Sequence, residues 1–566
     1  MSGTSHEPAS RLPVQRASGS DGFDEETDVV IVGSGAAGWT AAITAVTRDA
    51  EVLMLEKADA IGGTTRKSGA WFWIPNNRFL REAGIDDRRE DALRYMCRLA
   101  RPELYDADAA AESFGLPRED FALLEAFYDH ASAAVDELEQ AGALKLFHPA
   151  ELPDYYAQLP ENRTPAGRVL MPLGANGEDP GEGEDFIGQL SSRGAELGVD
   201  VRCGHRVCAL VLNDADEVVG VVADGPAGKV RVRARRAVVF ASGGFAQNPE
   251  MRRAFLGGPV FGSCSVPSNT GDFIPMASAV GAPLYGMSYP WLGPVPLERG
   301  LRNAPDNWLM FEPAGDSMIM VNRYGRRFVD EKIQYNEITQ TMWTWDPSRA
   351  EYPNLCPVMI WDQECQDRWQ GTMWGNPIAP AGDDDGHVLH GDTLEELAAA
   401  VRVRLHELRG ETGGYRLDDG FDEALKGSVA RFNEHAAAGQ DPDFDRGSAP
   451  ISVFFQAALG EARPGNEASP LIHPLSGSGP YHATILAPAT LDTKGGPRTN
   501  DKAQVLDASG SPIPGLYGAG NCVASVSGKA YFAGGATIGP AMAFGYLAAL
   551  SAVAEPVREL TTEAVA

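Results

Sequence analysis

Cysteine is scarce in this 566-residue sequence, and its seven cysteines are scattered without a CxxC pair. An odd, dispersed set is not a disulfide framework and favours reduced thiols in a cytoplasmic protein. A long run of large apolar residues is also missing. Residues 533–554 carry no charged side chain, but more than half of them are Ala or Gly. We therefore expect a helix buried inside the protein and no transmembrane segment.

Positive charge is scarce as well: 48 Lys and Arg residues stand against 78 Asp and Glu, which leaves a net charge of −30. Such an acidic protein is a poor partner for nucleic acid or for an anionic membrane. Residues 1–24 are polar and lack the apolar stretch of a signal peptide, so we expect a flexible N-terminal tail. The remaining length is too great for one simple core and predicts two domains.

The stretch from Asp28 to Lys57 combines a short apolar strand, a glycine-rich turn, an Ala-rich helix, a second apolar strand and an acidic residue. In its G-x-G-x-x-G spacing, the first glycine permits a tight turn, the second lets a pyrophosphate touch the backbone, and the third lets helix and strand pack closely. The helix N-terminus favours phosphate, and Glu56 is placed to accept hydrogen bonds from a ribose. The predicted dinucleotide-binding residues of this stretch are Gly33, Gly35, Ala36, Ala37, Gly38, Glu56 and Lys57.

A second glycine-rich turn follows at residues 61–69. An NAD enzyme would not need it, whereas a flavin has a large ring to cradle, so we expect FAD. Two later strands, within residues 238–244 and 515–521, end in glycines and would return to the same sheet. A last long helix over residues 530–554 would aim its positive end at the flavin. These segments and a strand near residue 207 add Gly63, Thr64, Thr65, Ser68, Gly69, Val207, Ala241, Gly243, Gly520, Asn521, Ala536 and Ile538 to the predicted cofactor-binding residues.

The composition changes between residues 284 and 475, where tryptophan and proline are frequent and no second G-x-G-x-x-G occurs. We interpret this region as an inserted α+β domain that caps the flavin. The predicted fold class is α/β: a Rossmann-type FAD-binding domain in two parts, residues 25–283 and 476–566, with the substrate-capping domain of residues 284–475 between them. The acidic run at residues 383–385 is typical of a solvated turn, and we expect no metal site.

Four segments carry a resemblance to a known flavoprotein family: VVIVGSGAAG, EKADAIGGTTRKSGA, VVFASGGF and GLYGAGNCVASVSGKAYFAGGATIGPAMAFG. Their order and spacing resemble those of the fumarate reductase/3-ketosteroid dehydrogenase family over nearly the whole sequence after the tail. Residues 530–535 resemble the Tyr-x-x-x-Gly segment of 3-ketosteroid 1-dehydrogenases, and residues 327–335 resemble their segment ending in a catalytic tyrosine. The resemblance implies non-covalent FAD and desaturation of a ring next to a ketone, with a steroid as the favoured substrate.

By this resemblance, the Tyr531 hydroxyl and the Gly535 backbone N–H would hold the ketone oxygen, as an oxyanion hole does. Tyr335 would take the α-proton, and flavin N5 would take the β-hydride. Because the reference pKa of tyrosine is about 10, a neighbour must help Tyr335 to ionise. The three catalytic candidates are therefore Tyr335, Tyr531 and Gly535.

The sequence departs from the family pattern at one point. Family members carry a further tyrosine, which assists the base, just before a Pro-Asp-Tyr segment. Here Pro153-Asp154-Tyr155 is present, but residues 146–150 contain no tyrosine. These residues belong to a proline-rich stretch, residues 144–172, that is typical of a loop lining a substrate pocket. Tyr155, Tyr156 or His148 substitutes for the missing tyrosine, or the base works alone.

Three alternatives stay open on the sequence. A fumarate reductase-like enzyme would need a histidine before the Gly-Gly pair at residues 495–496 and an arginine acid, whereas residues 491–494 read Leu-Asp-Thr-Lys. A dehydrogenase of a smaller cyclic ketone would use the same tyrosines, and a catalytically silent flavin-binding protein would not need them. Covalent flavin attachment is unsupported, since no histidine lies between Gly62 and Trp73. No motif identifies the electron acceptor or the oligomeric state.

Overall fold

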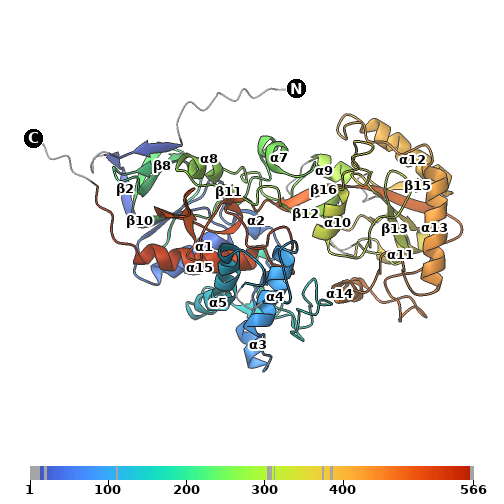
Figure 1. Ribbon diagram of the computed structural model, residues 1–566, viewed down its shortest axis with the longest axis horizontal. Coiled ribbons are helices and arrows are strands. Elements are labelled where there is room, and N and C mark those ends of the chain that lie inside the picture. The colour runs from blue at the N-terminus through green and yellow to red at the C-terminus, as the bar shows by residue number, and fades with distance from the viewer. Residues whose placement is uncertain are drawn as a thin grey trace, which may run out of the picture.

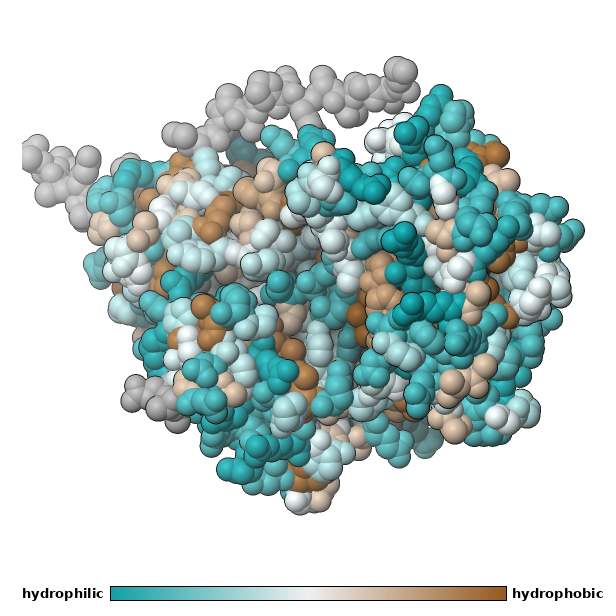
Figure 2. Space-filling model, turned by 45° about the vertical axis from the view of Figure 1, so that its right-hand side comes forward, coloured by the Kyte–Doolittle hydropathy of each residue, from teal (hydrophilic) through white to brown (hydrophobic). Residues whose placement is uncertain are grey.

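The computed structural model describes residues 13–17, 22–109, 113–302, 309–311, 313–372, 375–380, 382 and 386–560. These residues form two regions side by side (Figure 1), one built on a nine-stranded sheet and the other on a five-stranded sheet. The face shown in Figure 2 is mainly hydrophilic, and its apolar residues lie in small separate patches. In the described part of the protein, no helix has both the length and the apolar character needed to cross a membrane.

The larger sheet has the strand order β1-β8-β9-β10-β2-β3-β7, and β19 joins it beside β10. At its centre, β2 (Glu25–Val32) pairs in parallel with β3 (Val52–Leu55) on one side and with β10 (Gly228–Phe240) on the other. β10 also pairs in parallel with β19 (Pro512–Gly518). The β-branched run of β2 is fully buried, because both faces of this part of the sheet pack against other elements.

Helix α1 (Ala36–Val46) connects β2 to β3 and packs against α15 (Ile538–Ala554), which also contacts α5 (Arg118–Gln140). Glycines allow α1 to pack closely against the turn after β2 and against α15. A Cβ atom on Gly38 would lie 2.0 Å from the Gly33 carbonyl oxygen, and one on Gly545 would lie 2.5 Å from the Ala37 carbonyl oxygen. The charge-free stretch near the C-terminus is therefore a helix packed inside the protein, as its composition predicts.

The smaller sheet has the order β12-β16-β14-β13, and β15 also pairs with β16. Alternate residues of its strands face two different cores. Val358 and Ile360 pack with α12 and α13, while Met359 and Trp361 pack on the opposite face. The strands are β12 (Trp291–Pro296), β13 (Met318–Val321), β14 (Val358–Asp362), β15 (Leu389–Gly391) and β16 (Tyr481–Asp492), and the two helices are α12 (Leu394–Glu407) and α13 (Phe421–Ala437).

The remaining elements are short or lie around these two sheets (Figure 1). The other helices are α2 (Gly63–Arg66), α3 (Arg78–Glu82), α4 (Arg89–Ala100), α6 (Gly183–Glu196), α7 (Pro249–Phe255), α8 (Phe273–Ala279), α9 (Leu297–Arg302), α10 (Tyr335–Met342), α11 (Gln363–Trp369) and α14 (Pro450–Leu459). The other strands are β1 (Val14–Arg16), β4 (Phe72–Trp73), β5 (Leu146–Phe147), β6 (Val169–Pro172), β7 (Asp200–Arg202), β8 (Arg206–Leu212), β9 (Val218–Gly225), β11 (Leu284–Tyr285), β17 (Gly496–Pro497) and β18 (Gln504–Leu506).

The structure corrects several boundaries expected from the sequence. Within the expected flexible tail, Val14–Arg16 forms β1 and pairs in parallel with β8. β16, which pairs with β12 and β14 of the smaller sheet, spans Tyr481–Asp492 and so lies beyond residue 475, the expected end of the capping domain. The loop expected at residues 144–172 contains β5 and β6, and the last helix begins at Ile538 and not at residue 530. The acidic run at residues 383–385 lies outside the described residues.

A buried ion cluster holds the loop that carries Tyr155. The Arg168 guanidinium is fully buried and donates hydrogen bonds to Asp87 at 2.7 and 2.8 Å and also to Asp154. Asp154 accepts a further hydrogen bond from the Trp73 indole N–H at 2.8 Å. Two carboxylates thus share one cation away from water, and burial raises the pKa of Asp154.

Replacing Arg168 by methionine would leave these two buried carboxylates without their cation. We expect Arg168→Met to lower the free energy of unfolding by about 3–5 kcal/mol, the usual effect of removing one partner from a buried ion pair. Urea denaturation followed by circular dichroism measures this change. The matched control is Arg163→Met, because the Arg163 side chain is 64% exposed and lies 3.5 Å from Asp91. A surface pair contributes about 0–1 kcal/mol, so equal losses in the two variants would contradict the role given to Arg168.

Candidate active site

A cavity lies between the larger sheet and the capping region, and residues of both line it. The predicted cofactor-binding residues all line this cavity except Gly38 and Ala536, and the predicted catalytic residues Tyr335, Tyr531 and Gly535 line it as well. Gly38 lies within α1 against the Gly33 carbonyl oxygen, so it serves helix packing. Ala536 is buried beside a second, smaller pocket. The structure therefore brings together nearly all of the residues that the sequence predicts.

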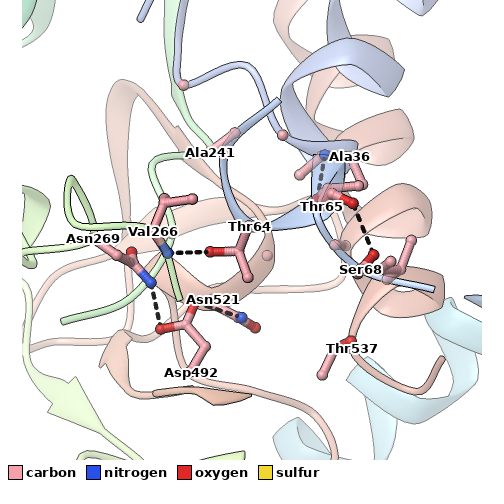
Figure 3. Close-up of a pocket in the computed structure, with 18 of the residues that line it drawn as sticks. Ala36, Thr64, Thr65, Ser68, Ala241, Val266, Asn269, Asp492, Asn521 and Thr537 are labelled. Carbon is pink, nitrogen blue, oxygen red and sulfur yellow. Dashed lines mark hydrogen bonds between the residues drawn. The ribbon is translucent and has the colours of Figure 1, made fainter. Parts of the chain in front are cut away.

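The N-terminus of α1 forms one part of the cavity wall. The Ala36 N–H donates to the Thr65 hydroxyl at 3.2 Å, and the Ser68 hydroxyl donates to the Thr65 carbonyl oxygen at 2.8 Å (Figure 3). Gly33 has a φ of +102°, and a Cβ atom there would lie 2.5 Å from the Ala241 carbonyl oxygen. Backbone N–H groups at a helix N-terminus suit a pyrophosphate.

Glu56 is buried directly after β3, where the sequence predicts a ribose contact. Its carboxylate accepts hydrogen bonds from the Ser34 hydroxyl at 2.6 Å, the Ser34 N–H at 3.1 Å and the Ala58 N–H at 2.8 Å. A carboxylate has about four acceptor positions, so room remains for a ribose hydroxyl. Neighbouring Lys57 is paired with Asp272 at 3.0 Å. The glycine turn, the helix N-terminus and this acceptor together fit a dinucleotide cofactor such as FAD.

Val266, Asn269 and Asp492 also line the cavity but are absent from the sequence prediction. The Val266 N–H donates to the Thr64 hydroxyl at 3.2 Å, and the Asp492 carboxylate accepts from the Asn269 and Asn521 amides at 2.6 and 2.9 Å (Figure 3). Asp492 directly follows a largely apolar stretch, and a polar residue at the end of a buried strand is the one signal that would have found it. Val266 and Asn269 lie in a loop without such a signal.

Three tyrosines meet in the cavity. Tyr335 is the first residue of α10, Tyr531 lies in the loop before α15, and Tyr155 lies in the loop between β5 and β6. All three are buried, and their ring centroids are 5.5–5.9 Å apart. The Tyr155 hydroxyl donates to the Tyr335 hydroxyl at 3.2 Å. Of the three residues that the sequence left open as the assisting group, Tyr155 is thus the one beside Tyr335. The His148 ring instead contacts the Gly167 carbonyl oxygen at 2.9 Å.

Burial governs the ionisation of this cluster. It raises the pKa of the Tyr335 hydroxyl well above its usual value, and the neighbouring tyrosines act in the same direction. Burial also raises the pKa of Tyr531, while interactions with the Tyr335 hydroxyl, the Thr537 hydroxyl and the Gly535 N–H lower it. The Tyr531 hydroxyl and the Gly535 N–H therefore lie next to each other, and both tyrosines are neutral at physiological pH.

The wall around the tyrosines is apolar and aromatic. The Trp291 ring stands edge-on to Tyr531, with the ring centroids 4.7 Å apart. Among the described residues that line the cavity, Lys57 is the one Lys or Arg, and its ammonium is paired with Asp272. An uncharged, largely apolar ligand fits this part of the cavity, because the described lining residues offer a carboxylate no unpaired Lys or Arg. The other wall residues are Trp71, Phe311, Phe455 and Leu491.

Comparisons with known proteins agree with this geometry. The model of a family described as an FAD binding domain matches residues 28–538. A 4-oxocyclohexanecarboxylate 2-dehydrogenase of Sinomonas cyclohexanicum is 30% identical, with 92% of each protein covered. A 3-oxosteroid 1-dehydrogenase of Mycobacterium tuberculosis is 32% identical, with 93% of this protein and 98% of that one covered.

A solved structure is similar over the same length. It is the crystal structure of a 3-ketosteroid delta1-dehydrogenase from Sterolibacterium denitrificans in complex with 1,4-androstadiene-3,17-dione. The match has a TM-score of 0.78 at 27% sequence identity, and it covers 94% of this protein and 99% of that one. The similarity therefore includes both sheets and the cavity between them.

The raised pKa of Tyr335 predicts that its hydroxyl stays protonated in mildly alkaline solution. A hydroxyl whose pKa is raised by burial loses its proton only at a higher pH than tyrosine in water. In an ultraviolet titration from about pH 7 to pH 10, Tyr335→Phe should therefore gain as much tyrosinate absorbance as the unmodified protein. A smaller gain in Tyr335→Phe would contradict the prediction.

Proposed function

Because the protein belongs to the FAD binding domain family, we propose that it is a flavin-dependent dehydrogenase that introduces a C=C bond next to a ring ketone, with 3-oxosteroids as its substrate class. One observation carries the proposal: Tyr335, Tyr531 and Gly535 gather in a buried cluster inside the same cavity as the dinucleotide cradle. The full-length similarity to a 3-oxosteroid 1-dehydrogenase supports it.

The cofactor of the proposed reaction is FAD, held by the α1 N-terminus, the glycine turn and Glu56. When bound, FAD supplies the acceptor for the hydride that leaves the substrate. We propose that it is bound without a covalent link. Cys264 is the one cysteine among the described residues that line the cavity, and burial raises the pKa of its thiol to about 12. A thiol that stays protonated is a poor nucleophile, which supports non-covalent binding.

Two donors serve the ketone oxygen of the proposed substrate: the Tyr531 hydroxyl and the Gly535 N–H. Removal of the α-proton moves negative charge onto this oxygen, and preorganised donors in a dry site stabilise that charge strongly. Glycine is required at position 535 because its φ is +82° and a Cβ atom would lie 2.4 Å from the Phe72 backbone nitrogen.

Tyr335 accepts the α-proton in the proposed reaction. The burial that raises its pKa keeps the ionised fraction small at neutral pH, but each ionised hydroxyl is then a stronger base than tyrosinate in water. Tyr335 must first release its own proton. A neutral Tyr155 hydroxyl, 3.2 Å away, is placed to donate a hydrogen bond to this oxygen. Tyr155 therefore takes the role of the assisting tyrosine.

The charges in the cavity wall favour one of two candidate substrate classes, steroids or smaller acidic ketones. The 4-oxocyclohexanecarboxylate 2-dehydrogenase among the relatives makes a small cyclic keto acid the second candidate substrate class. A carboxylate in a buried site needs a cationic partner. Lys57, the one Lys or Arg among the described lining residues, is already paired with Asp272. An uncharged steroid is therefore favoured over a keto acid and over a dicarboxylate.

We also propose a cytoplasmic location. All seven cysteines are free, and five of them are buried. A set of unpaired thiols is typical of proteins that work in a reducing compartment.

Anaerobic addition of candidate substrates to the purified yellow protein tests the proposed function. A 3-oxo-4-ene steroid or a 5-reduced 3-oxosteroid should bleach the flavin, whereas cyclohexanone, 4-oxocyclohexanecarboxylate and succinate should do so slowly or not at all. Acid treatment of a second portion should release intact FAD into the supernatant, and flavin left on the precipitate would refute non-covalent binding. If the dithionite-reduced protein reduces fumarate while all ketones are inert, the proposed reaction is wrong.

The roles of the two tyrosines predict different kinetic effects. Tyr531→Phe removes one of two donors to the ketone oxygen and should lower kcat by roughly 10²–10³. Tyr335→Phe removes the base and should lower kcat by roughly 10²–10⁴. Because the raised pKa of Tyr335 lies well above its usual value, the rate of the unmodified enzyme should still be rising at about pH 10. That rise should persist at a lower level in Tyr531→Phe and vanish in Tyr335→Phe.

The matched control for both variants is Tyr156→Phe, because Tyr156 neighbours Tyr155 in the sequence but does not line the cavity. Its kcat and pH profile should remain close to those of the unmodified enzyme. A Tyr335→Phe variant with an unchanged pH profile would place the base elsewhere, and Tyr155 would then be the residue to replace.

A further inference from the structure

Asp492 lies at the end of β16 with its carboxylate in the cavity wall, 4% exposed. Four N–H groups donate to it. The Asn269 amide and the Thr493 N–H reach Oδ1 at 2.6 and 2.7 Å, and the Asn521 amide and the Gly244 N–H reach Oδ2 at 2.9 and 3.4 Å. Figure 3 shows the two amide side chains meeting this carboxylate from different segments. Each carboxylate oxygen therefore accepts two hydrogen bonds.

No Lys or Arg among the described residues forms an ion pair with Asp492. The Cys264 thiol interacts electrostatically with Asp492, and Lys494 lies two residues further along the sequence. Burial raises the pKa of Asp492 to about 6, and its four hydrogen bonds act in the opposite direction. The charge of this carboxylate is therefore held by N–H donors alone, and it disappears in mildly acidic solution.

The ionised carboxylate fixes the direction of a series of hydrogen bonds. Because Asn521 donates its amide N–H to Asp492, its carbonyl oxygen faces Trp291 and accepts the indole N–H at 3.2 Å. The Trp291 ring in turn stands edge-on to Tyr531. A protonated Asp492 would offer an O–H, so that Asn521 would turn its carbonyl oxygen toward it and present its NH₂ group to Trp291. Two donors would then face each other.

We propose that ionised Asp492 is a positioning residue that couples the dinucleotide cradle to Tyr531 through Asn521 and Trp291. Asn269 and Asn521, the two amides that it orients, belong to the cavity wall next to the glycine ends of β10 and β19. The catalytic half of this inference rests on the proposed function, and the cofactor half does not. Protonation of Asp492 would therefore weaken both FAD binding and the positioning of Tyr531.

Asp492→Asn tests the cofactor half, because it keeps the shape of the side chain and removes the charge. The apoprotein is titrated with FAD, and flavin fluorescence gives the dissociation constant between about pH 5 and pH 8. If the ionised form binds FAD, affinity should fall by about tenfold per pH unit below the pKa of about 6. Asp492→Asn should bind FAD roughly tenfold more weakly at the alkaline end, without this pH dependence.

The matched control is Asp330→Asn, because burial also raises the pKa of Asp330 to about 6 but its carboxylate does not line the cavity. This variant should keep the pH dependence of FAD binding. Equal affinity of the unmodified protein for FAD at both ends of the pH range would overturn the proposal. So would a pH dependence that survives in Asp492→Asn. The FAD titration of the unmodified protein still tests the proposal if Asp492→Asn does not fold.

Trp291→Phe tests the catalytic half, because it removes the indole N–H and keeps an aromatic ring beside Tyr531. Asp492→Asn and Trp291→Phe should each lower kcat on a 3-oxosteroid by roughly tenfold at saturating FAD, and the double variant should be no slower than the slower single variant. If the effects of the two single substitutions on kcat multiply in the double variant, the proposed coupling is wrong. Loss of FAD binding at acidic pH in a protein that no ketone bleaches would refute the proposed function and leave the cofactor half standing.

Discussion

The pairing of β16 with β12 is the contact on which the geometry of the site depends. It places Asp492 opposite Trp291, at the point where the capping sheet reaches the larger sheet. The residues after β16 continue into the cavity wall. The Lys494 ammonium lies 3.6 Å from the centroid of the Trp291 ring and donates to the Ala530 carbonyl oxygen at 3.2 Å. Ala530 directly precedes Tyr531, so β16 and the residues that follow it set the position of Tyr531 from two sides.

Exclusion of water gives this site its chemical character. Burial raises the pKa values of Tyr335, Tyr531 and Asp492 and lowers that of Lys494, so every shift favours the neutral form. At neutral pH the two tyrosines therefore carry no charge, whereas Asp492, whose raised pKa is about 6, remains a carboxylate. In such a low-dielectric setting, a donor aimed at a developing negative charge is worth more than in water. The same exclusion of water makes ionisation of Tyr335 difficult.

The sequence predicted the parts of the site that consecutive residues encode. A glycine turn, a helix start and an acidic strand end follow from local backbone chemistry, and the residues predicted between Gly33 and Gly69 line the cavity, with the exception of Gly38. Tyr155, Trp291 and Asp492 are far apart in the sequence and meet only through the pairing of β16 and the packing of the Arg168 loop. No pattern of neighbouring residues predicts contacts between residues so far apart. For the same reason the pairing of β16 with the smaller sheet is not visible in the sequence, because β16 follows a long segment outside the sheet that it completes.

The fold by itself does not decide between desaturating a ketone and reducing a dicarboxylate, because one scaffold can serve several chemistries. The side chains around the tyrosines decide. A dicarboxylate brings two charges that a buried wall can accept only with cations. Lys57, the one Lys or Arg among the described lining residues, is neutralised by Asp272, whereas aromatic rings and neutral hydroxyls surround Tyr335. A neutral ring gains from this wall by burying apolar surface, and its single carbonyl oxygen needs only the two donors at Tyr531 and Gly535.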